Sequence, residues 1–223
     1  MLTNLSFYYT ISLSYIKIKG VYKMTELENK CLYHATRLHE GVTYGGGMVM
    51  LDQVKGTTEL VQKHSTLDKE DKEVAVCASL LHKCFETKRI AEGVSPLTPE
   101  QIKQIAGPKV LSVIQELMTE PEDENKTKKE QWEEKAEWAK TLSPQAQEIL
   151  LAEKIMNFQT SRDKPNPKKP LSWHQEYFQT RMILVDSLKD VNPELYKIAV
   201  QTKDEGLKKI VAMQKMLANG GRE

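Results

Sequence analysis

The feature of the sequence that most constrains its fold is an apolar run over residues 73–91, EVAVCASLLHKCFETKRIA. Its apolar residues recur at intervals of three and four positions, which places them on one side of an α-helix. Cys77 and Cys84 lie within the run and add to its apolar character. We expect this segment to be the central and most buried helix, with the other elements packed around it.

Start and stop signals predict further helices on both sides of this run. Thr25 is a candidate N-cap for a first helix, and Thr57 and Thr58 are candidate caps for a helix that carries Leu60 and Val61. A helix after residue 98 should begin with a proline and a capping-box glutamine and stop at a Gly-Pro pair. Helices are also expected over residues 109–118, 144–156, 173–188 and 193–217, the last of which could break at Gly206.

The remaining segments are expected to be loops. Three glycines at 45–47 break the chain, the charged stretch 121–130 is typical of a solvated surface excursion, and residues 162–170 are rich in proline and lysine. Residues 48–51 are too short an apolar run to separate a strand from a helical turn, and a loop is the prediction there. Strand-like alternation is nearly absent outside residues 1–23. The predicted fold class is therefore all-α, with a single helical domain.

Length and charge exclude several classes of protein. With 223 residues, the chain suits one domain with a core of its own. Its 32 basic and 31 acidic residues leave a net charge of +1, so we expect neither a nucleic acid nor a membrane as partner, and any anion site must be local. Three cysteines without CxxC spacing favour reduced thiols and thus a cytoplasmic protein.

Residues 1–23 differ from the rest of the chain because they are rich in Tyr, Ser and Ile. Their apolar part is too short and too polar to span a bilayer, and it lacks the basic start and the cleavage site of a secretory signal. Met24 then begins an ordinary helix start. We expect residues 1–23 to be a poorly ordered leader or the product of an upstream start site, and residues 24–223 to form the helical domain.

Four segments follow one another along the chain: ASLLHKCFET at 78–87, GPKV at 107–110, LAEKIMNF at 151–158 and QEYF at 175–178. In this order they resemble the hydrolase domain of the RelA/SpoT family, especially its small stand-alone metazoan form. The resemblance extends over most of the domain, and it implies an HD-type helical fold. It also implies a hydrolase that uses manganese to remove pyrophosphate from guanosine tetraphosphate.

In that family, two histidines and two aspartates hold one divalent cation, which polarises the attacking water. The resemblance places His82 at one ligand histidine and Glu153 at one ligand aspartate, whereas Lys83 replaces the aspartate that should follow His82. A cation at a ligand position opposes a bound metal. The family's first ligand histidine has no counterpart here, and counting back by the family's spacing reaches Gly56, or Asp52 if a short gap is allowed. The metal ligands are thus His82, Glu153 and Asp52 at most.

Other positions carry part of the family's pattern. Glu86 matches the glutamate of a pair that orients the attacking water, but Thr87 replaces the aspartate of that pair. Asn157 and Tyr177 match an asparagine and a tyrosine near the nucleotide. The resemblance therefore implies that some of the catalytic and metal-binding residues of the family are replaced in this chain, while part of the nucleotide site is retained.

Lys83 could also take the metal's place, because its ammonium is a compact charge that can pair with Glu86 and Glu153. The leading hypothesis is a catalytically degenerate relative of the guanosine tetraphosphate hydrolases that needs no cofactor. It would serve as a nucleotide-binding or interaction module, with Lys83, Asn157 and Tyr177 directed at a guanine nucleotide. A second hypothesis is an active manganese-dependent phosphohydrolase with the altered ligand set and Glu86. A third is a structural interaction protein without a ligand, whose protein partner is unknown.

Overall fold

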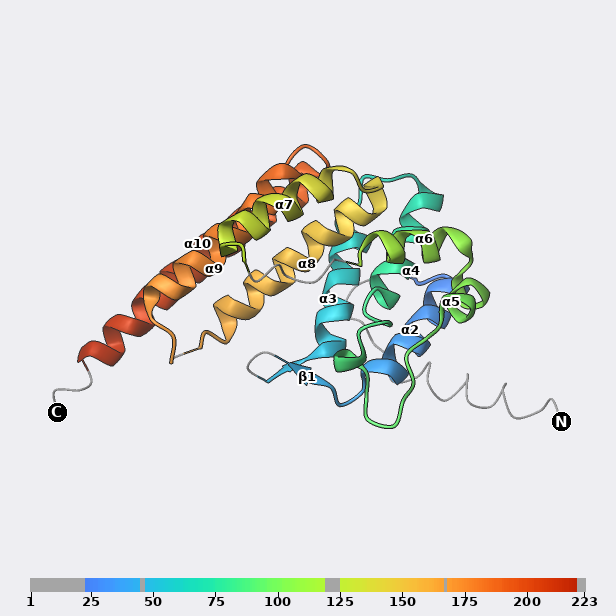
Figure 1. Ribbon diagram of the computed structural model, residues 1–223, viewed down its shortest axis with the longest axis horizontal. Helices are drawn as coiled ribbons and strands as arrows, with labels where there is room; N and C mark the ends of the chain where they lie inside the picture. Colours follow the sequence, from blue (N-terminus) through green and yellow to red (C-terminus); the bar gives the residue numbers. More distant parts are fainter. Residues whose placement is uncertain (1–22, 45–46, 119–124, 167, 220–223) are drawn as a thin grey trace.

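A computed structural model describes residues 23–44, 47–118, 125–166 and 168–219. The predicted leader falls almost wholly outside this part of the chain, as do residues 121–124 of the predicted surface excursion. The described residues form helices and one small hairpin, which confirms the all-α class (Figure 1). The elements follow in the order α2 (Glu26–His39), β1 (Thr43–Tyr44), β2 (Met48–Val49), α3 (Met50–His64), α4 (Lys69–Leu81), η1 (Thr87–Arg89), α5 (Pro99–Ala106), α6 (Pro108–Glu116), α7 (Lys128–Lys140), α8 (Pro144–Asp163), α9 (Leu171–Ser187) and α10 (Pro193–Asn219).

Apolar side chains gather in two cores that share α8. The first core joins α2 to α6, and α4 lies at its centre, with every residue from Ala75 to Leu81 buried. The second core joins α7, α9 and α10. Helix α8 contributes Ile149 and Ala152 to the first core and Leu151 and Ile155 to the second. The prediction of a central buried helix at α4 is confirmed, and α8 is a second one.

The helix starts predicted at Thr25 and after residue 98 are confirmed. Thr25 accepts a hydrogen bond from the backbone N–H of Glu28, whose side chain accepts one in return from the N–H of Thr25. The same capping box forms between Thr98 and Gln101 at the start of α5. Gly107 ends α5 with a φ of 88°, a conformation that favours glycine, and this allows α6 to start directly after it.

The loop predicted over residues 48–51 and the helix caps predicted at Thr57 and Thr58 are wrong. β2 pairs antiparallel with β1, and α3 begins directly at Met50. Thr57 and Thr58 therefore lie in the middle of α3, where both are buried. The hydroxyl of Thr58 donates to the carbonyl O of Val54 and contacts Oγ of Ser79 at 2.8 Å, so this polar residue is satisfied inside the helix and links α3 to α4.

Three further features of the helices differ from the prediction. α4 ends at Leu81, well before the end of the apolar run, and the chain then turns through η1. α7 was not predicted at all. α10 continues through Gly206, where an added Cβ would lie 2.8 Å from Cζ of Phe178. The glycine at this position thus allows α9 to approach α10 closely rather than breaking the helix.

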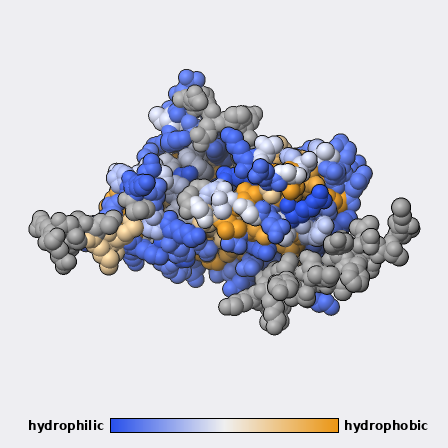
Figure 2. Space-filling view, turned by 90° about the horizontal axis from the view of Figure 1, so that it is seen from below, coloured by the Kyte–Doolittle hydropathy of each residue, from blue (hydrophilic) through white to orange (hydrophobic). Residues whose placement is uncertain are grey.

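Most of the surface seen from below is hydrophilic (Figure 2). Hydrophobic surface gathers toward the right of that view, on the half of the molecule that holds α2 to α6. Among the described helices, none is both long enough and apolar enough to cross a bilayer. All three cysteines are buried and none forms a disulfide.

Candidate functional site

The end of α4 meets the middle of α8 at a cluster of charged side chains. Because α4 ends at Leu81, His82 and Lys83 lie in the turn that follows it and face Glu153 of α8. The Nζ of Lys83 lies 2.9 Å from Oε1 of Glu86 and 3.6 Å from Oε1 of Glu153. The pairing of Lys83 with both carboxylates, expected from the sequence, is present in the structure.

The backbone holds His82 in one orientation. Its Nδ1 lies 2.7 Å from the carbonyl O of Ser79, so Nδ1 carries a proton and donates it, since a carbonyl oxygen can only accept. The neutral ring then has a lone pair on Nε2, which is buried without a hydrogen-bond partner and lies 3.8 Å from Oε2 of Glu153. Burial, together with the nearby Lys83, lowers the pKa of His82 to about 4. His82 is therefore neutral at pH 7.

Glu153 carries its charge although it is buried. Its Oε1 lies 3.5 Å from Nζ of Lys154, in addition to the contact with Lys83. Burial would raise the pKa of Glu153, but the ammonium groups of Lys154 and Lys83 outweigh burial and hold that pKa well below its usual range. At Lys83, burial is in turn outweighed by Glu153 and Glu86, which raise the pKa of the lysine. Two ammonium groups thus neutralise this buried carboxylate.

A cavity of about 250 Å³ opens beside the charged cluster. Helix α7 forms one wall of it with Trp132, Lys135 and Trp138, and Lys154 of α8 lies nearby. The Nζ atoms of Lys135 and Lys154 lie 5.1 Å and 5.5 Å from the centre of the Trp132 ring, within the range of a cation–π interaction. The rest of the lining consists of His82, Lys83, Phe85, Glu86, Leu117, Met118, Leu150, Glu153 and Leu184.

Trp132 also lines a second cavity, of about 330 Å³, between α7 and α9. The guanidinium carbon of Arg181 lies 4.9 Å from the centre of the Trp132 ring and 3.6 Å from that of Tyr177. Tyr177 stacks on Trp173, with ring centres 5.6 Å apart and planes 28° apart. Residues spaced by four share a helix face, so α9 presents an aromatic and cationic ridge that leads to Trp132.

Comparisons with known proteins bear on the fold. No family model matches the sequence, and no curated protein shows significant similarity to it. A solved structure of a metazoan ortholog of SpoT superposes on this chain with a TM-score of 0.64 and 20% sequence identity, over 83% of this chain and 99% of that one. The chain has a SpoT-like fold. The metazoan ortholog hydrolyzes ppGpp and plays a role in starvation responses.

Within this SpoT-like fold, the predicted site residues separate into two groups. The structure brings His82, Lys83, Glu86 and Glu153 together around one cavity, and Tyr177 lines the adjoining cavity. These residues come from the ends and middles of helices that are distant in the sequence. Their convergence gives the candidate site its position at the contact of α4, α7, α8 and α9.

Asp52 and Asn157 lie outside both cavities. Asp52 is exposed in the first turn of α3. The neighbouring Gln53 turns to α8, where its Nε2 donates to Oδ1 of Asn157 at 2.9 Å. Asn157 therefore connects two helices, and the structure does not bring Asp52 to His82 and Glu153.

The residues at the site do not fit a divalent metal ion. Over the ranges that the structure describes, no three His, Cys, Asp or Glu side chains are grouped so that they could hold one. His82 and Glu153 are close to each other, but the ammonium groups of Lys83 and Lys154 already pair with the carboxylate of Glu153. A dication at this place would meet two positive charges, which oppose its binding.

Sequence reasoning missed the wall that α7 contributes. Trp132, Lys135 and Trp138 follow the charged stretch that was predicted to be a surface excursion. A signal for this helix was present, because Thr127 and Glu130 form a capping box at its start. That motif, followed by residues with high helix propensity, could have identified α7.

Proposed function

We propose that this chain is a non-hydrolytic relative of the ppGpp hydrolases that binds a nucleotide without a metal. The observation that carries the proposal is the position of Lys83, whose ammonium pairs with Glu86 and Glu153. The family resemblance implies a metal-ligand aspartate at this position. A lysine there supplies the positive charge that stabilises Glu153, but it offers no open coordination site for an attacking water.

The lining of the two cavities supports a phosphorylated aromatic ligand. Lys135 can neutralise phosphate oxygens, and the rings of Trp132 and Tyr177 offer surfaces for a base. The chain as a whole carries a net charge of only +1, so this gathering of cations is local. A guanine nucleotide is the expected ligand, on the strength of the fold that the chain shares with a ppGpp hydrolase. The three buried, unpaired cysteines support a reducing, cytoplasmic compartment.

Nucleotide binding is expected to raise the melting temperature of the protein, because a ligand that binds only the folded state stabilises it. GDP and ppGpp should both act in the absence of divalent metal. Lys135→Gln should weaken binding of either by about tenfold, the loss of one charge-assisted phosphate contact. Thermal shift and isothermal titration calorimetry measure both effects.

The matched control for this experiment is Lys129→Gln on the same helix. Lys129 is exposed and pairs with Glu133, away from the cavity, so binding should not change. If no guanine nucleotide shifts the melting temperature, the nucleotide proposal fails and a structural interaction protein is favoured. If the protein turns over ppGpp, the non-hydrolytic proposal fails.

Lys83→Asp is expected to create manganese binding that the unmodified protein lacks. The new carboxylate would stand beside the unpartnered Nε2 of His82 and the carboxylate of Glu153. Elemental analysis after dialysis against manganese should find little metal in the unmodified protein and close to stoichiometric metal in the variant. Lys109→Asp, which changes an exposed lysine by the same charge, is the control.

Two outcomes of the metal measurement would contradict the proposal. Stoichiometric manganese in the unmodified protein would favour the hypothesis of an active phosphohydrolase in which Glu86 orients the water. No gain of metal in Lys83→Asp would mean that the lysine is not what prevents metal binding, and that the site lacks further ligands.

A further inference from the structure

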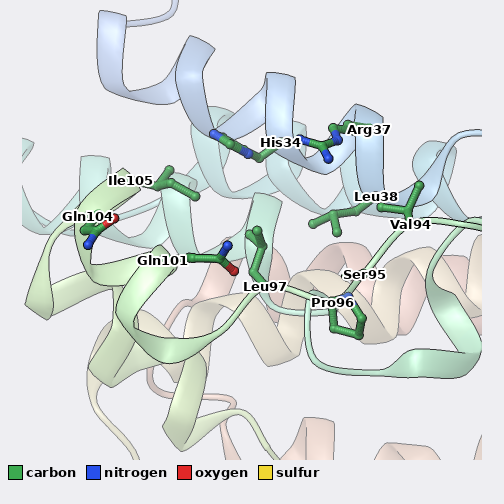
Figure 3. A pocket seen from close by; sticks show the side chains of 10 residues that line it. All are labelled: His34, Arg37, Leu38, Val94, Ser95, Pro96, Leu97, Gln101, Gln104 and Ile105. Carbon is green, nitrogen blue, oxygen red and sulfur yellow. The ribbon is translucent and has the colours of Figure 1, made fainter.

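We propose that the groove between α2 and α5 is a docking site for an acidic amphipathic segment of a partner protein. The groove holds a cavity of about 300 Å³ and lies outside the residues of the candidate nucleotide site. Figure 3 shows α2 and α5 on either side of it, with the segment from Val94 to Leu97 between them. The proposal does not depend on nucleotide binding.

The lining of the groove includes four apolar side chains. They are Leu38 of α2, Val94 and Leu97 of the connecting segment and Ile105 of α5. Gln101 and Gln104 of α5 add amide groups at its edge. Such a surface buries one or two apolar side chains of a partner and leaves polar groups at the rim, the arrangement of a groove that binds an amphipathic segment.

The charge of the groove favours an acidic partner segment. None of its lining residues is acidic, whereas Arg37 and His34 belong to it. Lys30, His34 and Arg37 follow one another on the same face of α2, over about 10 Å of helix. Arg37 is exposed and forms no ion pair within the described residues, and the Nζ of Lys30 donates to the carbonyl O of Gln104 at 3.4 Å. Burial, together with Lys30 and Arg37, lowers the pKa of His34, so the positive charge of this edge comes from Lys30 and Arg37. Two cations about 10 Å apart along the helix fit a segment with more than one acidic residue.

A random peptide library displayed on phage tests the proposal with the whole chain as bait. We expect the enriched sequences to combine Asp and Glu with Leu, Ile or Phe. A synthetic copy of the most enriched peptide should bind about tenfold more weakly to Arg37→Glu than to the unmodified protein, and more weakly at high salt than at low salt. Arg37→Gln should have an intermediate effect.

The control for charge reversal is Lys208→Glu, at an exposed position of α10 far along the chain from the groove. It should leave the affinity unchanged, and circular dichroism should show that all variants are folded. Chemical shift changes on peptide binding should map to α2, α5 and residues 94–97. Neutral or basic enriched peptides, an affinity that Arg37→Glu does not reduce, no enrichment at all, or shift changes confined to α7 and α9 would each overturn the proposal.

Discussion

Replacing Lys83 with methionine is expected to lower the free energy of unfolding by about 3 kcal/mol, because removing one partner leaves a buried charge undercompensated. The uncompensated charge is that of Glu153, because its carboxylate is buried and would pair with Lys154 alone. Glu86 is exposed and can turn to water. Urea denaturation monitored by circular dichroism at pH 7 measures the loss.

A double-mutant cycle with Glu153→Gln isolates the contact itself. The double variant should be more stable, by about 1 to 2 kcal/mol, than the sum of the two single effects predicts, because each single variant leaves the other partner uncompensated. Lys109→Met is the surface control: Lys109 pairs with Glu70 in solvent and its loss should change little. Additive effects of Lys83→Met and Glu153→Gln would show that the two groups do not stabilise each other.

Stability is expected to fall as the pH is lowered from 7 to 5, and His82 should account for about 2 kcal/mol of the fall. The folded protein holds the pKa of His82 at about 4, against 6.5 for an unperturbed histidine. As the pH falls, His82 is therefore protonated in the unfolded chain at a higher pH than in the folded protein. The stabilising contribution is complete above pH 6.5 and is lost as the pH falls toward 4. Denaturation curves measured at several pH values give this slope.

His82→Asn should remove that part of the pH dependence. The asparagine amide can still donate to the carbonyl O of Ser79, but it does not titrate. His64→Asn is the control: the pKa of His64 is also lowered by burial and by Lys63, but His64 is only partly buried and lies away from the site. If His82→Asn lost as much stability between pH 7 and 5 as the unmodified protein, His82 would not be the titrating group.

The sequence predicted those parts of the fold whose signals are local. The capping boxes at Thr25 and Thr98 and the apolar run of α4 need only neighbouring residues to be interpreted. α7 lacked a clear apolar face, because its buried residues are two alanines and a glutamine among charged ones. Its position depends on packing against α9, which no local pattern contains.

The candidate site was predictable to a similar extent. The contact of Lys83 with Glu86 and Glu153 followed from the family resemblance, which places Lys83 and Glu153 at two ligand positions of one metal site and Glu86 beside them. Asp52 was reached by counting residues across a gap, and the structure places it on an exposed turn instead. The capping box of Thr127 and Glu130 could have identified α7, but its position as the wall that holds Trp132 depends on which helix covers the end of α4.

Helix α8 is covered on opposite faces by the two cores. If the chain were divided before or after α8, the fragment with α8 would expose one of its apolar faces, and the other fragment would lack the helix that completes its core. We therefore expect that neither half can be transferred alone to another protein. The candidate nucleotide cavity, built from α4 on one side of α8 and α7 on the other, exists only while both halves are assembled on that common helix.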